Sequence, residues 1–203
     1  GSLHLLRNRV PESENVLKLI DNIENCSVRA RDLTKGLLSF GKPTAKRKEI
    51  VMPNFILSEI AKVVSQTFPS NISLEEKIDE KLHNILGNGT EIYQILLNLC
   101  VNAKESIERK GKIILGASNI KVDDSNIISY PLLDRGKYVN FFVSDTGSGI
   151  DEENISKIFD PYFSTKQKDT GSGLGLYVTY GIIKAHNGHV DVTSQKGIGT
   201  RFD

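Results

Sequence analysis

The longest apolar stretch of the chain, EIYQILLNLCVNAKESI at residues 91–107, is the feature that most constrains the fold. Its apolar residues recur at the spacing of a helix. Asn88 can cap this helix, and Glu91, three residues later, completes a capping box. The sequence therefore predicts a half-buried helix over residues 89–109.

The segments around this helix alternate between helical and extended patterns. Helices are predicted at residues 55–68 and 173–186, and strands at 71–78, 112–121 and 137–144, with two short strands at the end of the chain. Several of the strands are neighbours in this order. We therefore predict an α+β fold, an α/β sandwich in which helices cover one face of a mixed sheet.

A regular heptad seam precedes this domain. Its apolar residues step by three and four at a and d positions: Val16, Leu19, Ile23, Cys26, Ala30, Leu33, Leu37 and Phe40. So narrow a stripe needs a partner helix, although an ordinary amphipathic helix lying on its own domain is the alternative. Residues 3–9 resemble the end of an earlier helix, with Pro11 in the turn. We therefore predict a helical hairpin, truncated at its start, over residues 1–41.

The segment GKPTAKRK at residues 41–48 breaks the seam with glycine, proline and basic residues. We interpret residues 42–53 as a linker to a second domain at 54–203. The basic run is explained by a solvated connector, and a docking patch is the alternative.

The composition is that of a soluble globular protein, with 38% hydrophobic and 25% charged residues. A net charge of +1 gives no reason to expect nucleic acid or an anionic membrane as a partner. Cys26 and Cys100 lie far apart in helical patterns, which indicates thiols in a reducing cytosol. No uncharged run approaches the ~20 apolar residues of a membrane span. We expect a cytoplasmic domain without membrane contact, although a segment ahead of it could anchor the full-length protein.

The segment FFVSDTGSGI carries a strand directly into Asp145, followed by Gly147 and Gly149. An acid at a strand end, beside glycines that let a ligand approach the backbone, can recognise a flat heterocycle with an amino group. A plain Asx turn explains the same letters. They also resemble the Asp-Thr-Gly-Ser element of aspartic proteases, but the single copy would then require a homodimer.

The segment TGSGLGLYVTYGIIKAHNG places Gly171, Gly173 and Gly175 ahead of and inside the start of a helix. Backbone amides and the positive end of the dipole suit phosphate oxygens there. No Gly-Lys-Ser/Thr follows, so this is not a Walker loop. The dinucleotide fingerprint does not fit either, because the segment follows a polar loop and its glycine spacing is one residue short.

Taken in order, NLCVNA, DTGSGI, IFDPYFSTK and GSGLGLYVTYGIIKAHNGHV resemble the four nucleotide-binding boxes of sensor histidine kinases. These kinases belong to the gyrase, chaperone, histidine kinase and MutL ATPase superfamily, whose domain has the Bergerat-type fold. The resemblance covers residues 54–203, and residues 14–40 are similar to the second helix of the family's dimerisation hairpin. NAKES followed by FSTK is similar to the nitrogen-regulatory type, in which a glutamate, here Glu105, replaces the more usual lysine.

The resemblance implies a role for the two asparagines, which stand four residues apart on one face of the helix. Asn102 would ligate a Mg²⁺ that bridges the ATP phosphates, and Asn98 would lie beside it. Hydrolysing members of the superfamily carry a glutamate base where Asn98 stands. An amide cannot accept a proton from water at neutral pH, so the resemblance implies an enzyme that holds ATP for transfer to another nucleophile.

Other roles follow from the same resemblance. Asp145 would accept the adenine amino group, with Thr200 assisting through water. Phe159 and Phe163 would anchor a mobile lid, with packing under a loop as the alternative, and Lys166 would meet a phosphate. Asn98, Asn102 and Lys166 are the implied catalytic residues. The implied nucleotide-binding residues are Asn98, Asn102, Glu105, Asp145, Gly147, Gly149, Ile150, Phe159, Phe163, Thr165, Lys166, Gly171, Ser172, Gly173, Leu174, Gly175, Leu176 and Thr200.

The histidines depart from the family pattern. A phosphoacceptor in this family precedes an acidic residue and begins the first hairpin helix, whereas His4 precedes two leucines near the end of that helix. His83 falls in a strand or loop. His186 and His189 flank Asn-Gly at a helix end, where a cap explains His186 and a metal pair is the alternative. We therefore expect the acceptor to be missing from this chain.

The resemblance implies ATP and Mg²⁺ as cofactors, a response-regulator receiver domain as a partner, and a homodimer formed through the hairpin. The γ-phosphoryl group would pass from ATP to a histidine and then to an aspartate of the regulator. Two alternatives come from other classes of protein: a nucleotide-binding regulatory module that transfers no phosphate, and a homodimeric aspartic protease.

Overall fold

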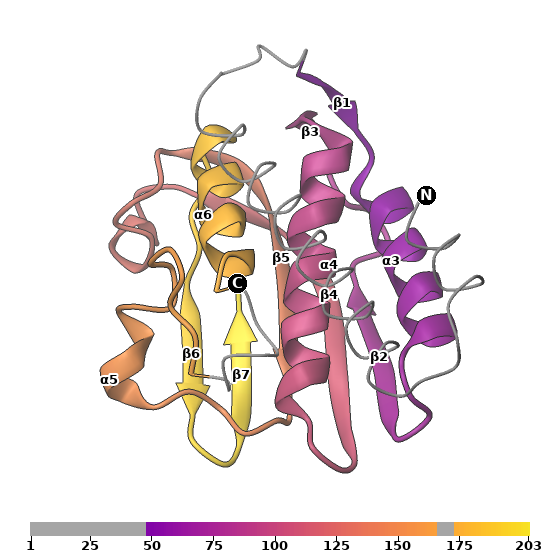
Figure 1. The fold of residues 1–203 in the computed structure, drawn as a ribbon. Coiled ribbons are helices and arrows are strands. Elements are labelled where there is room, and N and C mark those ends of the chain that lie inside the picture. Colours follow the sequence, from indigo (N-terminus) through magenta and orange to yellow (C-terminus); the bar gives the residue numbers. More distant parts are fainter. Residues whose placement is uncertain (1–47, 166–172) are drawn as a thin grey trace, which may run out of the picture. The chain divides into compact units, whose positions relative to one another are not determined.

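The computed structural model describes residues 48–165 and 173–203 (Figure 1). The chain divides between Thr44 and Ala45, and the described residues all belong to the second unit. The hairpin expected over residues 1–41, with its heptad seam, lies outside the described residues.

A mixed sheet of five strands forms one layer of the domain. Its order is β2 (Ile72–Ile78), β4 (Gly111–Val122), β5 (Gly136–Asp145), β7 (Gly199–Phe202) and β6 (Val192–Gln195). β2 and β4 are parallel, and the other neighbouring pairs are antiparallel. The predicted strands are therefore present: the three with expected bounds, β2, β4 and β5, lie within one residue of them at either end, and β6 and β7 are the two short strands at the end of the chain.

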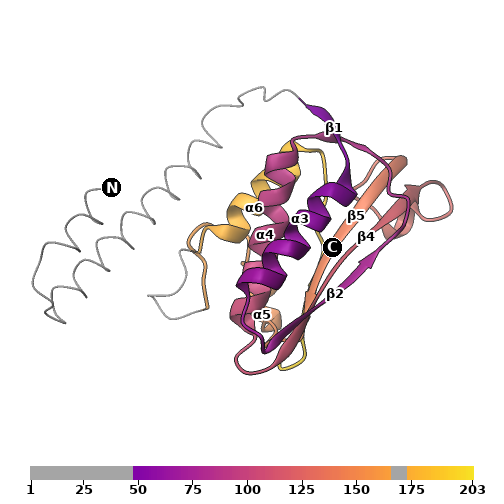
Figure 2. The ribbon, with the colours of Figure 1, turned by 90° about the vertical axis from the view of Figure 1, so that its right-hand side faces the viewer.

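The helices α3 (Pro53–Thr67), α4 (Gly89–Ser106) and α6 (Gly175–Ala185) cover one face of this sheet, as Figure 2 shows. The core lies between the two layers. On β4, side chains at every second position, Ile113, Leu115 and Ala117, are fully buried. The predicted sandwich with helices on one face is confirmed.

Short elements escaped the sequence analysis. β1 (Glu49–Val51) pairs antiparallel with β3 (Ile85–Gly87), and β1 falls inside the range expected to be linker. The single-turn helices α5 (Glu152–Ile155) and η1 (Ile127–Ser129) were not expected either. These elements are too short to show a clear hydrophobic period of their own.

The start of α4 differs in part from the predicted capping box. The side-chain Oδ1 of Asn88 accepts a hydrogen bond from the Glu91 N–H at 3.2 Å, as expected of an N-cap. The Asn88 N–H, however, donates to Nε2 of His186 at 3.0 Å. The helix also ends at Ser106 and not at residue 109, because Ile107 takes an extended conformation with φ −94° and ψ 105°.

Among the described residues, no helix combines the length and the apolar character needed to cross a lipid bilayer.

Candidate functional site

Asp145 is the last residue of β5, and its side chain is only 9% exposed. Its Oδ1 accepts the Gly147 N–H at 2.7 Å and lies 3.0 Å from Oγ of Ser106. The bond to Gly147 is the Asx turn considered above. The Asx turn is compatible with a role of Asp145 in binding a ligand, because the turn uses one carboxylate oxygen, Oδ1, and holds the carboxylate in one orientation.

Ser106 connects α4 to this carboxylate, and it belongs to none of the motifs named above. Its Oγ lies 2.8 Å from the Ala103 carbonyl oxygen as well as 3.0 Å from Asp145, so its single proton can serve either acceptor. Its own carbonyl oxygen accepts the Ser148 N–H at 3.0 Å. Ser106 stands four residues after Asn102, so the spacing that paired the two asparagines also pointed to it.

Asn98 and Asn102 are both half-buried on α4. Nδ2 of Asn102 is covered from solvent and makes no hydrogen bond within the described part of the chain. A buried polar group without a partner costs about 1–3 kcal/mol, so this amide has bonding capacity that a ligand can use. Nδ2 can donate to an oxygen, and a half-turn of the amide would present Oδ1 to a cation. Glu105 lies exposed on the same helix.

The two glycines after Asp145 make room for protein atoms. A Cβ on Gly147 would lie 2.0 Å from Oγ of Ser106, and a Cβ on Gly149 would lie 2.1 Å from the Gln195 carbonyl oxygen. Gly149 also has φ +67°, which disfavours other residues. In this structure the missing side chains therefore let Ser106 of α4 approach the backbone at Gly147, and let Gln195 at the end of β6 approach the backbone at Gly149.

Thr200 on β7 is buried next to Asp145. A Cβ on the preceding residue, Gly199, would lie 2.0 Å from the Asp145 carbonyl oxygen. Oγ1 of Thr200 lies 2.8 Å from Oγ of Ser194, which also accepts the Ile150 N–H at 2.8 Å. Ser194 therefore ties Thr200 to the segment that follows Asp145, a role that no sequence motif indicated.

α6 begins at Gly175, directly after the buried residue Leu174. The Val178 N–H donates to the Leu174 carbonyl at 2.9 Å, which makes Leu174 the N-cap of the helix. Leu176 packs against the core. Within residues 48–165 and 173–203, a Cβ on Gly175 would meet nothing within 4 Å. α6 packs against α4, so its start belongs to the same layer as the asparagine helix.

The two segments that flank residues 166–172 are held together. The Tyr162 N–H donates to the Gly173 carbonyl at 3.0 Å, and a Cβ on Gly173 would lie 2.5 Å from the Tyr162 carbonyl carbon. Phe159 stacks on Tyr180 of α6 with ring centroids 5.2 Å apart, and Phe163 packs against the core.

The segment expected to form the lid, between Phe159 and Gly171, is therefore described only in part. Thr165 is exposed at the edge of the described segment. Lys166, Gly171 and Ser172 lie outside the described residues.

His186 acts as a helix cap, as predicted. Its backbone N–H donates to the Ile182 carbonyl at 3.1 Å, and its ring Nδ1 lies 2.9 Å from the same oxygen. A carbonyl can only accept, so Nδ1 carries the proton and Nε2 accepts the Asn88 N–H. His189 pairs with Asp191 at 3.0 Å, and His83 is exposed in the loop after β2.

Both ring nitrogens of His186 are therefore engaged, which leaves none for a metal. Across residues 48–165 and 173–203, no group of three or more His, Cys, Asp or Glu side chains could hold a metal ion.

Comparison with known proteins assigns the family. The profile described as Histidine kinase-, DNA gyrase B-, and HSP90-like ATPase matches residues 87–203. The chain belongs to this ATPase family. The matched range contains Asp145 together with the asparagine helix and the start of α6, so the family match does not favour the aspartic-protease interpretation.

Relatives carry the names of sensor kinases. Sensor kinase CckA of Brucella abortus (strain 2308) is 33% identical over 183 residues, which are 90% of this chain and 19% of CckA. Sensor histidine kinase ZraS of Escherichia coli (strain K12) is 31% identical over 203 residues, which are 100% of this chain and 40% of ZraS. The chain thus spans less than half the length of either relative.

Solved structures share the fold. Full-length ShkA in complex with AMPPNP matches with a TM-score of 0.77 at 23% identity, over 99% of this chain and 40% of ShkA. Histidine kinase ThkA in complex with the response regulator protein TrrA matches with a TM-score of 0.66 at 23% identity, over 100% of this chain and 54% of ThkA. At this identity the likeness establishes the fold of the ATPase domain.

Proposed function

We propose that this chain is the ATP-binding catalytic part of a sensor histidine kinase, which transfers the γ-phosphoryl group of ATP to a histidine for relay to a response-regulator aspartate. The observation that carries the proposal is the unused bonding capacity of Asn102. This amide belongs to α4, whose last residue, Ser106, lies 3.0 Å from the fixed carboxylate of Asp145 and which packs against α6.

In this proposal, the Asp145 carboxylate accepts a hydrogen bond from the amino group of adenine. The Gly147 N–H and Ser106 hold its Oδ1, so the carboxylate cannot rotate freely. An oriented acceptor in a buried setting suits the exocyclic amino group of adenine. Thr200, placed beside Asp145 by β7, would assist through a bridging water.

The start of α6 would hold the phosphates. Amides at a helix N-terminus and the positive end of its dipole favour phosphate oxygens. Gly175 has no side chain at that end, and among the described residues an added Cβ there would meet nothing within 4 Å. Lys166 would add a positive charge from the lid, and Phe159 and Phe163 would anchor the lid to the domain.

The residues present fit Mg²⁺ as well. Magnesium keeps several waters and binds through one or two protein oxygens plus the substrate phosphates, so a dedicated cluster of carboxylates is not required. Asn102 would supply the protein oxygen through Oδ1. When bound, the ion would neutralise charge that develops on the phosphates during transfer.

Asn98 favours transfer over hydrolysis. A side-chain amide cannot take a proton from an attacking water, so the site has no base at this position. The bound ATP would then react with a histidine of a dimerisation hairpin and not with water. Residues 1–41 would form part of that hairpin, and a linker at residues 42–53 would join it to the catalytic domain at residues 54–203. A receiver domain and a second copy of the chain would be the protein partners.

Titration calorimetry with ATP and Mg²⁺ tests the nucleotide part of the proposal. We expect one ATP site per chain, and the absence of binding would refute the assignment. Transfer is tested by adding a separate dimeric hairpin that carries the first helix and its histidine. We expect acid-labile, base-stable label on that hairpin and none on this chain, in low yield because no covalent linker concentrates the two. Binding without transfer would favour the regulatory module.

A further inference from the structure

Ser106 is attached to the turn after Asp145 through its backbone as well as its side chain. Its carbonyl oxygen accepts the Ser148 N–H at 3.0 Å, and its Oγ lies 3.0 Å from Oδ1 of Asp145. Gly147 makes this approach possible, because a Cβ at that position would lie 2.0 Å from Oγ and 2.7 Å from the Ser106 carbonyl oxygen. The backbone bond therefore places the hydroxyl beside the carboxylate.

The Ser106 hydroxyl has a single proton and two acceptors within reach. The Ala103 carbonyl oxygen lies 2.8 Å from Oγ, and Oδ1 of Asp145 lies 3.0 Å from it. A hydrogen bond to an ionised carboxylate is about twice as strong as one between neutral groups. We therefore expect the proton to point to Asp145 when that carboxylate is charged.

This bond completes the accepting capacity of Oδ1. A carboxylate has about four lone-pair sites, which is two on each oxygen. On Oδ1 of Asp145, the Gly147 N–H takes one site at 2.7 Å and the Ser106 hydroxyl takes the other. A ligand can then pair with the carboxylate only through Oδ2.

The purine bases differ in the donors that they bring to a carboxylate. Adenine brings one amino group, which a single oxygen can accept. Guanine brings its N1–H and its 2-amino group side by side, a pair that matches both oxygens of a carboxylate at once. With Oδ1 saturated, one of the two guanine donors would be buried without a partner, and a binding site rejects a ligand strongly on that ground.

We propose that Ser106 is a specificity-determining residue, which restricts the base site at Asp145 to adenine by saturating Oδ1. The inference rests on the proposed function, in which the Asp145 carboxylate accepts the amino group of adenine. Ser106 acts through Asp145, as a positioning residue. Without its hydroxyl, Gly147 alone would hold Oδ1, and the second lone-pair site of this oxygen would become available to guanine.

The test measures the affinity of Ser106→Ala for three nucleotides in the presence of Mg²⁺. These are ATP, GTP, and purine riboside triphosphate, which lacks the 6-amino group of adenine. The substitution removes the hydroxyl and keeps the backbone bond to Ser148. Ser65→Ala is the matched control, because it also removes a helical hydroxyl that donates to a backbone carbonyl, that of Ala61, at 2.7 Å. A thermal melt of each protein records any loss of stability.

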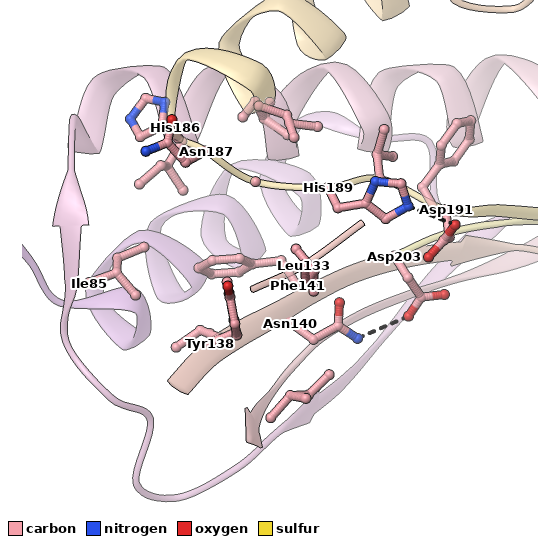
Figure 3. A pocket seen from close by; sticks show the side chains of 18 of the residues that line it. Ile85, Leu133, Tyr138, Asn140, Phe141, His186, Asn187, His189, Asp191 and Asp203 are labelled. Atoms are coloured by element: carbon pink, nitrogen blue, oxygen red, sulfur yellow. Dashed lines mark hydrogen bonds and ion pairs between the residues drawn. The ribbon is translucent and has the colours of Figure 1, made fainter. Parts of the chain in front are cut away.

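The comparison of nucleotides also shows where they bind. A cavity of about 590 Å³ is lined in part by Asn140 of β5 and by His186 and His189 at the end of α6 and after it, as Figure 3 shows. Neither Ser106 nor Asp145 lines this cavity. A nucleotide bound there would have the same affinity for the unmodified chain and for Ser106→Ala.

We expect Ser106→Ala to bind ATP about fivefold more weakly, purine riboside triphosphate as the unmodified chain does, and GTP at least as tightly. The preference for ATP over GTP should therefore fall by about fivefold or more, and Ser65→Ala should leave it unchanged. Equal losses for all three nucleotides would show that Ser106 only supports the fold, and unchanged affinities would show that it selects nothing. Either result would overturn the inference. Equal affinities of the unmodified chain for ATP and purine riboside triphosphate would instead refute the role of Asp145 in the proposed function, and the inference with it.

Discussion

Replacing Gly175 with alanine separates the fold from the proposed phosphate site. Gly175 is the first residue of α6, its φ is not positive, and within residues 48–165 and 173–203 an added Cβ would meet nothing within 4 Å. Alanine fits such a position and lowers the entropy of the unfolded chain, which stabilises a protein by about 0.4–1 kcal/mol. For a domain of this size we expect the melting temperature to rise by about 1–4 °C.

The effect on ATP should have the opposite sign. If phosphate oxygens occupy the open space at this helix end, the new methyl group collides with them. Forcing an extra methyl into a packed site costs about 1–3 kcal/mol, which corresponds to a dissociation constant about 5- to 150-fold higher. Titration calorimetry with ATP and Mg²⁺, beside a thermal melt of each protein, measures both quantities.

Gly89 supplies the matched control. It is the first residue of α4, and the nearest atoms to an added Cβ, on Ile56 and Val51, lie 3.9 Å away. Gly89→Ala should therefore stabilise the chain to a similar extent and leave ATP affinity unchanged. A Gly175→Ala protein that is folded and binds ATP as tightly as Gly89→Ala would refute the placement of the phosphates at α6.

Three further predictions test other parts of the site. Asp145→Asn can keep the bond from Gly147 through its oxygen while presenting an NH₂ group to adenine, so ATP affinity should fall by about 1.5–3 kcal/mol; equal affinities in calorimetry would contradict the assignment. Asn102→Ala should weaken the Mg²⁺-dependent part of ATP binding and spare adenosine binding without metal, whereas equal losses would indicate a folding defect. Burial raises the pKa of the Cys100 thiol to about 12, so in a Cys26→Ser background iodoacetamide at pH 8 should label Cys100 only after denaturation. Rapid labelling of the folded protein, followed by mass spectrometry, would show that α4 opens readily.

The sequence was sufficient for the elements with a long hydrophobic period. α4 and β5 each repeat their apolar spacing several times, so their type was predictable from residues close together in the chain. Asn88 was recognisable as a cap for the same reason. The motif residues near Asp145 and Gly175 were also found, because glycines beside an acid or before a helix follow local backbone requirements.

Contacts between distant residues required the tertiary structure. The bond from Ser106 to Asp145 spans 39 positions, and the bond from Asn88 to His186 spans 98. No local pattern predicts which turn of α4 meets the end of β5, or that a histidine takes the N–H that a capping box would use.

The chain by itself therefore determined which of its longer segments become helices and strands and which residue types could meet a nucleotide. The assembled domain decided how those residues are oriented: Ser106 of α4 holds Asp145, and the Gln195 carbonyl occupies the space that a side chain at position 149 would need. The physical reason is that secondary structure follows from spacing along one segment, whereas the packing of one layer on another fixes which side chains meet and which hydrogen-bonding groups remain open to a ligand.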